Sequence, residues 1–373
     1  MVYNVEIIFV GNVRMSIRAQ INRQIKTFTE TLGITAPVMS APMTGATTPE
    51  LVAAVSQAGG LGVLPCALMT PEEIFASVSQ VKTLTDRPFA VNLRIEPREP
   101  ENSQQTQALF DALEPLREEL GVSHTLFEIP NFDAQFEAVL TADVPAVSFS
   151  FGGPREVYAE ALEARGILMI GAVNSTREAK VLKTAGCQII VAQGAEAAGP
   201  RVCFENPAAA SQVGLGALLP PVVRVCGEVP VAAAGAMMSA RAMLAAMMNG
   251  ASGAVLGSYL LRTPECAWPD ALKNQIAWCD DAATRLTDVT SGRLSRVLPT
   301  GLTDALTEAG LEVSSYPGQF RVLQPIYRKA SEIGRLDLLE VPLGQAAQTA
   351  PAIAAEGAVK RLLGEFEALL GEM

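Results

Sequence analysis

One pattern recurs along the chain and constrains its fold more than any other feature: a helical segment, a glycine and then a short apolar run. It occurs in SQAGGLGVLP (56–65), EARGILMIGAV (163–173), KTAGCQIIVAQG (183–194) and MNGASGAVLGS (248–258). A glycine directly after a helix suits the left-handed conformation that ends it. Apolar runs of four to eight residues are typical of strands buried on both faces of a parallel sheet. The pattern therefore predicts repeated βα units.

Eight such strands are predicted, with helical patterns in most of the gaps between them. Pro49 and Pro71 are each expected at the first position of a helix, and a third helix is expected to start at NSTREAKVL. Eight βα units favour an α/β fold of the closed (β/α)8 type, the TIM barrel, and an open doubly wound sheet is the alternative. The predicted strands span residues 34–40, 60–64, 89–95, 146–151, 167–173, 189–193, 231–234 and 254–257.

The repeated pattern stops after the eighth strand. Residues 264–345 mix acids, two tryptophans and helical segments, which predicts a helical cap that contributes a substrate subdomain over the barrel mouth. The barrel is assigned to residues 28–263 and 346–373, and its closing helix is expected at 350–370. Residues 1–27 are expected to form an extension before the fold, although their Arg and Lys content leaves a transit peptide as an alternative.

Charge and composition narrow the classes of partner. The formal net charge is −11, so a basic surface for nucleic acid or an anionic membrane is not expected. No apolar run is long enough to span a membrane. The six cysteines are spread singly and His124 is the single histidine, which argues against a disulfide framework, a zinc site or a multi-histidine metal centre. A cytoplasmic protein without a metal is expected.

Small residues follow the seventh and eighth predicted strands, where TIM barrels commonly bind phosphate. Gly235 and Ala236 follow strand seven, and Gly257 and Ser258 follow strand eight. Small side chains let backbone N–H groups approach an anion, and the helix that begins near Ser239 adds a favourable dipole. Each glycine alone is explained equally well as a turn residue. The occurrence of both pairs at the expected places favours a phosphate site.

Other strand ends carry groups that suit a flat ligand. Ala41, Pro42 and Met43 offer backbone groups and a thioether, whereas Asn92 and Gln193 offer amides that donate and accept hydrogen bonds. This combination favours a planar heteroaromatic cofactor over a charged sugar. No GxGxxG motif stands in a first βαβ unit, so a Rossmann nucleotide site is not supported.

The same segments resemble the nitronate monooxygenase family, formerly called 2-nitropropane dioxygenases. The resemblance runs from about residue 28 to the end and is carried by ITAPVMSAPMTGATTPELVAAVSQAGGLGVLP, AVNL, SFSFGGP, VAQGAEAAG, VPVAAAGAMMSARAM, NGASGAVLGSYLLRTPEC, YPGQ and LGQAAQ. It implies an FMN-dependent TIM barrel. By the same resemblance, the backbone of Ala41–Met43 faces the isoalloxazine, Asn92 bonds its edge, and Gln193 and Gly194 lie near the ribityl chain. Gly235, Ala236, Gly257 and Ser258 would then hold the phosphate.

The chain departs from the family where a base is expected. The family's Glu-Ala-Gly-Gly-His motif, whose histidine deprotonates neutral nitroalkanes, is matched by Glu196, Ala197, Ala198, Gly199 and Pro200. A second histidine position, on strand four, holds Ser150. His124 lies in a polar stretch and is expected to be exposed and without a role. Where the family usually has two glycines, this chain has Gly235–Ala236, which is tolerable if the φ angle of Ala236 is negative.

A nitronate is already an anion and needs a cation more than a base. Arg201 is a candidate for that cation, with Ser150 as a second candidate catalytic residue; the alternative is that Arg201 points to solvent or pairs with Glu196 or Glu205. Together with the resemblance, these residues leave three candidate functions: an FMN monooxygenase that oxidises alkyl nitronates with O₂ and acts poorly on neutral nitroalkanes, an NAD(P)H-dependent quinone or enoyl-thioester reductase, or a flavin-binding protein without turnover. Substrate identity and oligomeric state are not encoded in a readable way.

Overall fold

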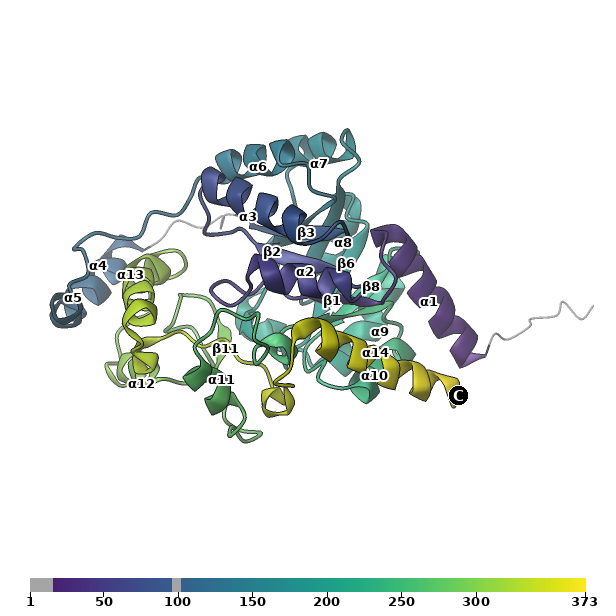
Figure 1. Ribbon diagram of the computed structural model, residues 1–373. Coiled ribbons are helices and arrows are strands. Elements are labelled where there is room, and N and C mark those ends of the chain that lie inside the picture. Colours follow the sequence, from purple (N-terminus) through teal and green to yellow (C-terminus); the bar gives the residue numbers. More distant parts are fainter. Residues whose placement is uncertain (1–15, 96–101) are drawn as a thin grey trace, which may run out of the picture.

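The structure, a computed structural model, describes residues 16–95 and 102–373. Eight parallel strands lie in the order β1-β9-β8-β6-β5-β4-β3-β2. Helices surround these strands (Figure 1). A parallel bridge between Met39 and Leu61 joins the two ends of this sheet and closes the barrel. The strands are β1 (Val38–Ser40), β2 (Gly62–Pro65), β3 (Phe89–Arg94), β4 (Ala146–Ser150), β5 (Leu168–Val173), β6 (Ile189–Gln193), β8 (Val231–Ala234) and β9 (Gly253–Leu256). The predicted TIM barrel is confirmed, and closure excludes the open doubly wound sheet.

Helices cover the outside of the barrel, and their caps follow from the sequence. Thr48 and Thr70 cap the helices that start at Pro49 and Pro71, and Ser175 caps the helix of the NSTREAKVL segment, so all three predicted starts are confirmed. The outer helices are α2 (Pro49–Gln57), α3 (Pro71–Leu84), α6 (Phe132–Thr141), α7 (Glu156–Glu163), α8 (Thr176–Thr184), α9 (Leu215–Cys226), α10 (Ala240–Met248) and the closing helix α14 (Ala355–Gly371). Short 3-10 turns span Ala208–Ser211, Ser258–Leu260, Leu336–Leu338 and Ala347–Thr349.

A helix before the first strand closes the amino-terminal end of the barrel. Helix α1 (Ile17–Leu32) buries Phe28 completely, and this ring lies so close to Gly253 that an added Cβ there would be 2.6 Å from a ring carbon. The expected boundary at residue 27 is therefore wrong, because α1 belongs to the folded unit. The transit-peptide alternative concerned the first 26 residues, of which 1–15 lie outside the described residues and 17–26 belong to α1.

The cap differs from its prediction in two ways. It draws on two parts of the chain, because α4 (Ser103–Ala112) and α5 (Glu114–Leu120) after β3 pack on α13 (Gly318–Ile333) (Figure 1). It is also not purely helical: β10 (Arg285–Thr287) and β11 (Ser295–Val297) form an antiparallel pair to which β7 (Gly199–Pro200) adds. The remaining cap helices are α11 (Asp270–Ile276) and α12 (Gly301–Glu308). Thus the loop after β6 is bonded directly to the cap.

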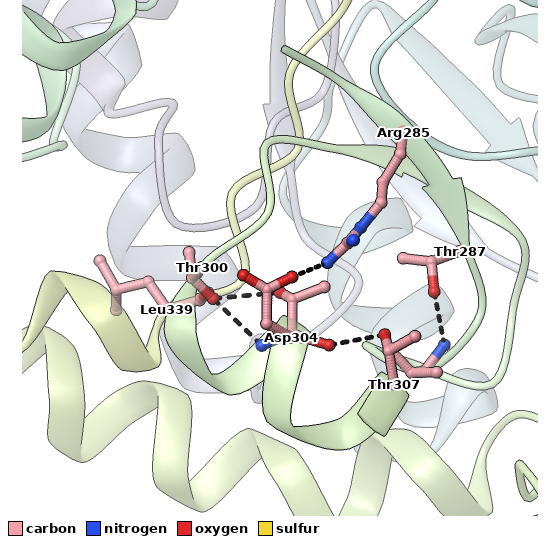
Figure 2. A network of polar contacts seen from close by, with 8 residues as sticks. Arg285, Thr287, Thr300, Asp304, Thr307 and Leu339 are labelled. Atoms are coloured by element: carbon pink, nitrogen blue, oxygen red, sulfur yellow. Dashed lines mark hydrogen bonds and ion pairs between the residues drawn. The ribbon is translucent and has the colours of Figure 1, made fainter. Parts of the chain in front are cut away.

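A polar network ties α12 to the neighbouring cap segments. Figure 2 shows Arg285 of β10 paired with Asp304 of α12. The Thr300 hydroxyl, which caps α12, donates to the carbonyl oxygen of Leu339 at 3.0 Å. This contact fixes the backbone of a segment that borders the cavity described next.

Candidate active site at the barrel mouth

A cavity of about 570 Å³ lies between the carboxyl ends of the barrel strands and the cap. This position is where TIM barrels carry their active sites, and the volume is that of a small-molecule or cofactor site. The structure brings together at its wall the sequence-selected residues Ala41, Pro42, Met43, Asn92, Ser150, Gln193, Gly235, Ala236, Gly257 and Ser258. Gly194 and Arg201 are not among the lining residues.

The ends of β8 and β9 form a shallow backbone cradle. Gly235 has a φ angle of +132°, which L residues rarely adopt, and Ala236 has a φ of +50°. The condition of a negative φ at Ala236 is therefore not met, and this alanine occupies the left-handed region that normally favours glycine. Within the described part of the chain, the backbone N–H groups of Gly235 and Ala236 donate to no protein acceptor. Free amides on a strained turn before a helix are suited to an anion.

The loop after β9 contributes the other side of this cradle. An added Cβ at Gly257 would meet the Cβ of Ala41 at 3.5 Å, so the ends of β1 and β9 approach closely. The Ser258 hydroxyl accepts a 3.0 Å hydrogen bond from the backbone N–H of Gly344, in the segment that leads to α14. Small residues on three segments thus leave the cradle lined mainly by backbone.

Asn92 and Ser150 form one polar cluster on the cavity wall. The Asn92 side-chain amide donates to the hydroxyl of Ser148 at 2.8 Å and to that of Ser150 at 3.2 Å. These bonds orient Asn92 from the neighbouring strand β4. Ser150 is therefore a hydrogen-bond partner of Asn92 as well as a wall residue.

Gln193 holds the loop that follows it. Its Nε2 donates to the carbonyl of Pro200 at 3.1 Å, and its Oε1 accepts from Asn174 and from the backbone N–H of Val202. These hydrogen bonds hold the Gln193 side chain against the loop, and the rest of the side chain faces the cavity.

Gly194 and Arg201 lie behind the wall, which revises their expected roles. A Cβ at Gly194 would be 2.3 Å from Glu196 Oε2 and 2.7 Å from Leu215 Cβ, so the glycine serves close packing. The Arg201 side chain is 1% exposed and donates to the carbonyls of Gly194, Ala197 and Gly199. Burial lowers the pKa of this guanidinium to about 10. Arg201 is neither exposed nor paired with Glu196, and it has no contact with the cavity.

Pro200 lines the cavity and pairs with Ser295 in the small cap sheet. Its ring offers no proton-accepting group. His124 does not take the role of a base in the cavity. Its half-exposed side chain lies in the cap, with Nδ1 2.7 Å from Glu114 Oε1. Cys203 is buried, and burial raises the pKa of its thiol, as expected for a structural cysteine.

Three arginines that sequence reasoning missed line the cavity, namely Arg94, Arg293 and Arg328. Arg94 ends β3, and its guanidinium donates to the Tyr316 hydroxyl at 2.9 Å. Arg293 comes from the loop between β10 and β11 and stacks 3.9 Å from the centre of the Phe151 ring. Its Nε has no hydrogen-bond partner among the described residues. Strand alternation could have identified Arg94, two residues after Asn92, whereas nothing in the sequence pattern identifies Arg293.

These features fit FMN. The cradle of free amides suits a phosphate, the apolar strand ends suit a flat ring system, and Asn92 reaches the cavity from its side. Within residues 16–95 and 102–373, no three His, Cys, Asp or Glu side chains are grouped as a metal site. No helix in that part of the chain has the length and apolar character needed to cross a membrane.

Comparisons with known proteins agree with this architecture. The family model described as nitronate monooxygenase matches residues 26–366. A probable nitronate monooxygenase of Staphylococcus aureus (strain Newman) is 29% identical over 346 residues, covering 92% of this chain and 97% of that protein.

Two solved structures are similar over nearly the whole chain. A nitroalkane oxidase from Streptomyces ansochromogenes superposes with a TM-score of 0.84 at 27% identity, covering 93% of this chain and 100% of the other. FabK from Thermotoga maritima has a TM-score of 0.73 at 25% identity, covering 92% and 97%. With its closed barrel and the cavity at the barrel mouth, the chain belongs to the nitronate monooxygenase family and is an FMN-dependent oxidoreductase.

Proposed function

We propose that the protein oxidises alkyl nitronates with O₂ and acts poorly on the corresponding neutral nitroalkanes. FMN, when bound, supplies the electron acceptor for this oxidation. Its binding residues are proposed to be Ala41, Pro42, Met43, Asn92, Gln193, Gly235, Ala236, Gly257 and Ser258, with Gly194 supporting the wall from behind.

The observation that carries the proposal is a cavity with cations on its wall and a proline where the resemblance to the family implies a histidine. Arg94, Arg293 and Pro200 all line it, and we take Pro200 to stand at that histidine position. A guanidinium matches the two oxygens of a nitronate and balances its charge. Because both arginines are partly buried, their attraction for an anion is screened less than at the surface. We therefore assign the substrate-facing charge to Arg293 and Arg94 in place of Arg201.

The absence of a base at Pro200 sets the preference between the two substrate forms. A positioned general base typically contributes about 10²–10⁴-fold to a proton transfer. A nitronate requires no proton removal, so it loses nothing from this substitution. The neutral nitroalkane must first lose an α-proton and is disfavoured. Ser150, hydrogen-bonded to Asn92, is proposed to orient the ligand.

Oxygen uptake tests this proposal directly. The purified flavin-loaded protein is assayed with preformed ethyl nitronate and with nitroethane at one pH and equal concentration. We expect oxygen consumption with the nitronate at a rate at least 10-fold above that with nitroethane. Absence of uptake with both substrates would contradict the proposal.

A second candidate is an NAD(P)H-dependent reductase of a quinone or an enoyl thioester. The structural similarity to FabK, at 25% identity, supports this second candidate. The two functions separate under anaerobic conditions, because NADH or NADPH bleaches the flavin absorbance rapidly in a reductase and slowly in a nitronate oxidase. The third possibility, a flavin protein without turnover, is set aside because the family is enzymatic.

A further inference from the structure

One cavity residue remains without a role in the proposed function. Glu340 follows the 3-10 turn at Leu336–Leu338 and lines the cavity, where it is the one carboxylic acid among the described wall residues. Its side chain is half-buried, so the carboxyl is enclosed by protein and still reaches the cavity.

The backbone on both sides of Glu340 is fixed. The Thr300 hydroxyl holds the carbonyl of Leu339 at 3.0 Å, as Figure 2 shows, and the backbone N–H of Leu298 holds the carbonyl of Val341 at 2.8 Å. Both anchors come from the cap around α12 and β11. These two contacts hold the backbone from which the Glu340 side chain extends, and a held backbone favours the defined position that proton transfer requires.

The surroundings of Glu340 include cations and hydroxyls but no second acid among the described wall residues. Arg94 from β3 and Arg293 from the β10–β11 loop line the same cavity, as do Tyr316, Tyr327 and Arg328 around α13. The Thr290 side chain is 1% exposed, and its hydroxyl lies near the Glu340 carboxyl. The Tyr327 hydroxyl already has a hydrogen-bond partner, because it donates to the Thr290 carbonyl at 2.9 Å.

Burial has the largest effect on the pKa of the Glu340 carboxyl. It raises the pKa of Glu340 to about 7, while the Thr290 hydroxyl and the charge of Arg94 act in the opposite direction. A carboxylate with a pKa near neutrality is ionised in part at pH 7 and is a stronger base than an ordinary glutamate.

We propose that Glu340 is the general base of this enzyme and replaces the histidine that Pro200 has displaced. Its carboxylate takes a proton from the α-carbon of a neutral nitroalkane in the cavity. The C–H bond breaks, its electron pair moves onto the nitro group to give the nitronate, and the proton remains on Glu340. No oxidant takes part in this step. The proposal rests on the proposed function, because it explains how slow turnover of the neutral substrate enters the nitronate route.

The other basic candidates do not offer this geometry. His124 lies against Glu114 in the cap, and it is not a cavity residue. Cys66 is buried, and burial raises the pKa of its thiol to about 12, so it carries no useful thiolate at pH 7. The guanidinium groups of Arg94 and Arg293 offer donors and no acceptor atom.

Exchange of α-protons with solvent deuterium tests the proposal without requiring oxidation. Nitroethane is incubated anaerobically in D₂O with the flavin-loaded protein, and loss of its α-proton signal is followed by ¹H NMR between pH 5.5 and 8.5. We expect enzyme-dependent exchange that rises with pH through about 7 for the wild type. In Glu340→Gln the exchange falls about 100-fold or more and the pH step disappears.

Three variants make the result specific. Glu308→Gln changes an exposed carboxylate on α12 and is expected to exchange as the wild type does. Glu340→Asp retains a carboxylate and should restore part of the exchange with its pH step. Thr290→Val removes the nearby hydroxyl and should move the midpoint of the pH step upward. Circular dichroism and flavin content identify any variant that has not folded.

The outcomes separate the two proposals. If Glu340→Gln exchanges α-protons at the wild-type rate with the same pH profile, Glu340 is not the base. The same conclusion follows if the wild type catalyses no exchange. Oxygen uptake with preformed ethyl nitronate is measured in parallel and is expected to persist in Glu340→Gln. If that uptake is absent in the wild type while exchange depends on Glu340, the proposed function fails and the assignment of the base stands.

Discussion

The guanidinium of Arg201 donates a 2.8 Å hydrogen bond to the carbonyl oxygen of Gly194, seven residues earlier in the same loop. Further bonds to the carbonyls of Ala197 and Gly199 make Arg201 the internal brace of the loop after β6. We expect Arg201→Met to lower the free energy of unfolding by about 2–4 kcal/mol, because buried carbonyls lose charged donors. Urea unfolding measures this effect.

The matched control for that substitution is Arg155→Met, which removes an exposed arginine paired with Asp133. It should change stability by less than about 1 kcal/mol. If Arg201→Met kept wild-type stability but selectively lost nitronate turnover, Arg201 would have to be assigned a role in binding the substrate.

Pro200→His is expected to add an imidazole base to the cavity wall, in addition to the base proposed at Glu340. The position lines the cavity, and the substitution also restores a backbone N–H in the short strand β7. We expect oxygen uptake with nitroethane to rise at least 10-fold relative to Pro200→Ala, while uptake with ethyl nitronate changes little. Equal rates for the histidine and alanine variants would show that a group at this position does not reach the substrate.

Arg293→Met is expected to weaken nitronate binding. The side chain fills similar space but removes the charge that faces the cavity, so kcat/KM for ethyl nitronate should fall about 10–100-fold, mainly through KM. Steady-state oxygen uptake measures both constants. Arg165→Met, an exposed change on the outer face, should leave them unaltered. An unchanged KM for ethyl nitronate in Arg293→Met would show that Arg293 does not bind the anion.

Ala236→Gly is expected to stabilise the protein by about 0.5–1 kcal/mol, since glycine occupies a φ of +50° without the steric cost that alanine bears. Flavin content should be unchanged. Gly235→Ala is the converse test, because its φ is +132° and a Cβ would lie 3.3 Å from the backbone nitrogen of Ala197. We expect it to lose both stability and FMN, as followed by thermal unfolding and flavin absorbance. Full flavin retention in Gly235→Ala would contradict the phosphate cradle.

The raised pKa of Glu340 predicts how stability depends on pH. The folded value is about 7, above the ordinary value of 4.5, so the folded protein binds a proton that the unfolded chain releases. This contribution is complete below about pH 4.5 and is lost as pH rises through about 7. The stability of the wild type relative to Glu340→Gln should therefore fall across that window and then level off. Urea unfolding at several pH values checks it, and a constant difference would contradict the raised pKa.

Much of the barrel and its mouth could be predicted because their signals are local. Glycines after helices, Pro at first helical positions and apolar runs located all eight strands to within a few residues. Strand one was predicted four residues too early, since Pro37 carries no N–H for the ladder and β1 starts at Val38. The residues directly after each strand reach the cavity because parallel strands all end at one rim of the barrel.

Tertiary structure decided what local patterns leave open. Nothing in the order of residues indicates that α4 and α5 join a cap formed 200 residues later, that Arg201 turns inward to its own loop, or that Arg293 and Glu340 reach the cavity from the cap. Such placements depend on packing between distant segments, and each polar side chain takes the partner that packing brings within hydrogen-bond distance. The sequence by itself determined the barrel and the small residues around its mouth, whereas only the folded arrangement decided which charges face the ligand, because burial and pairing are properties of the assembled surface.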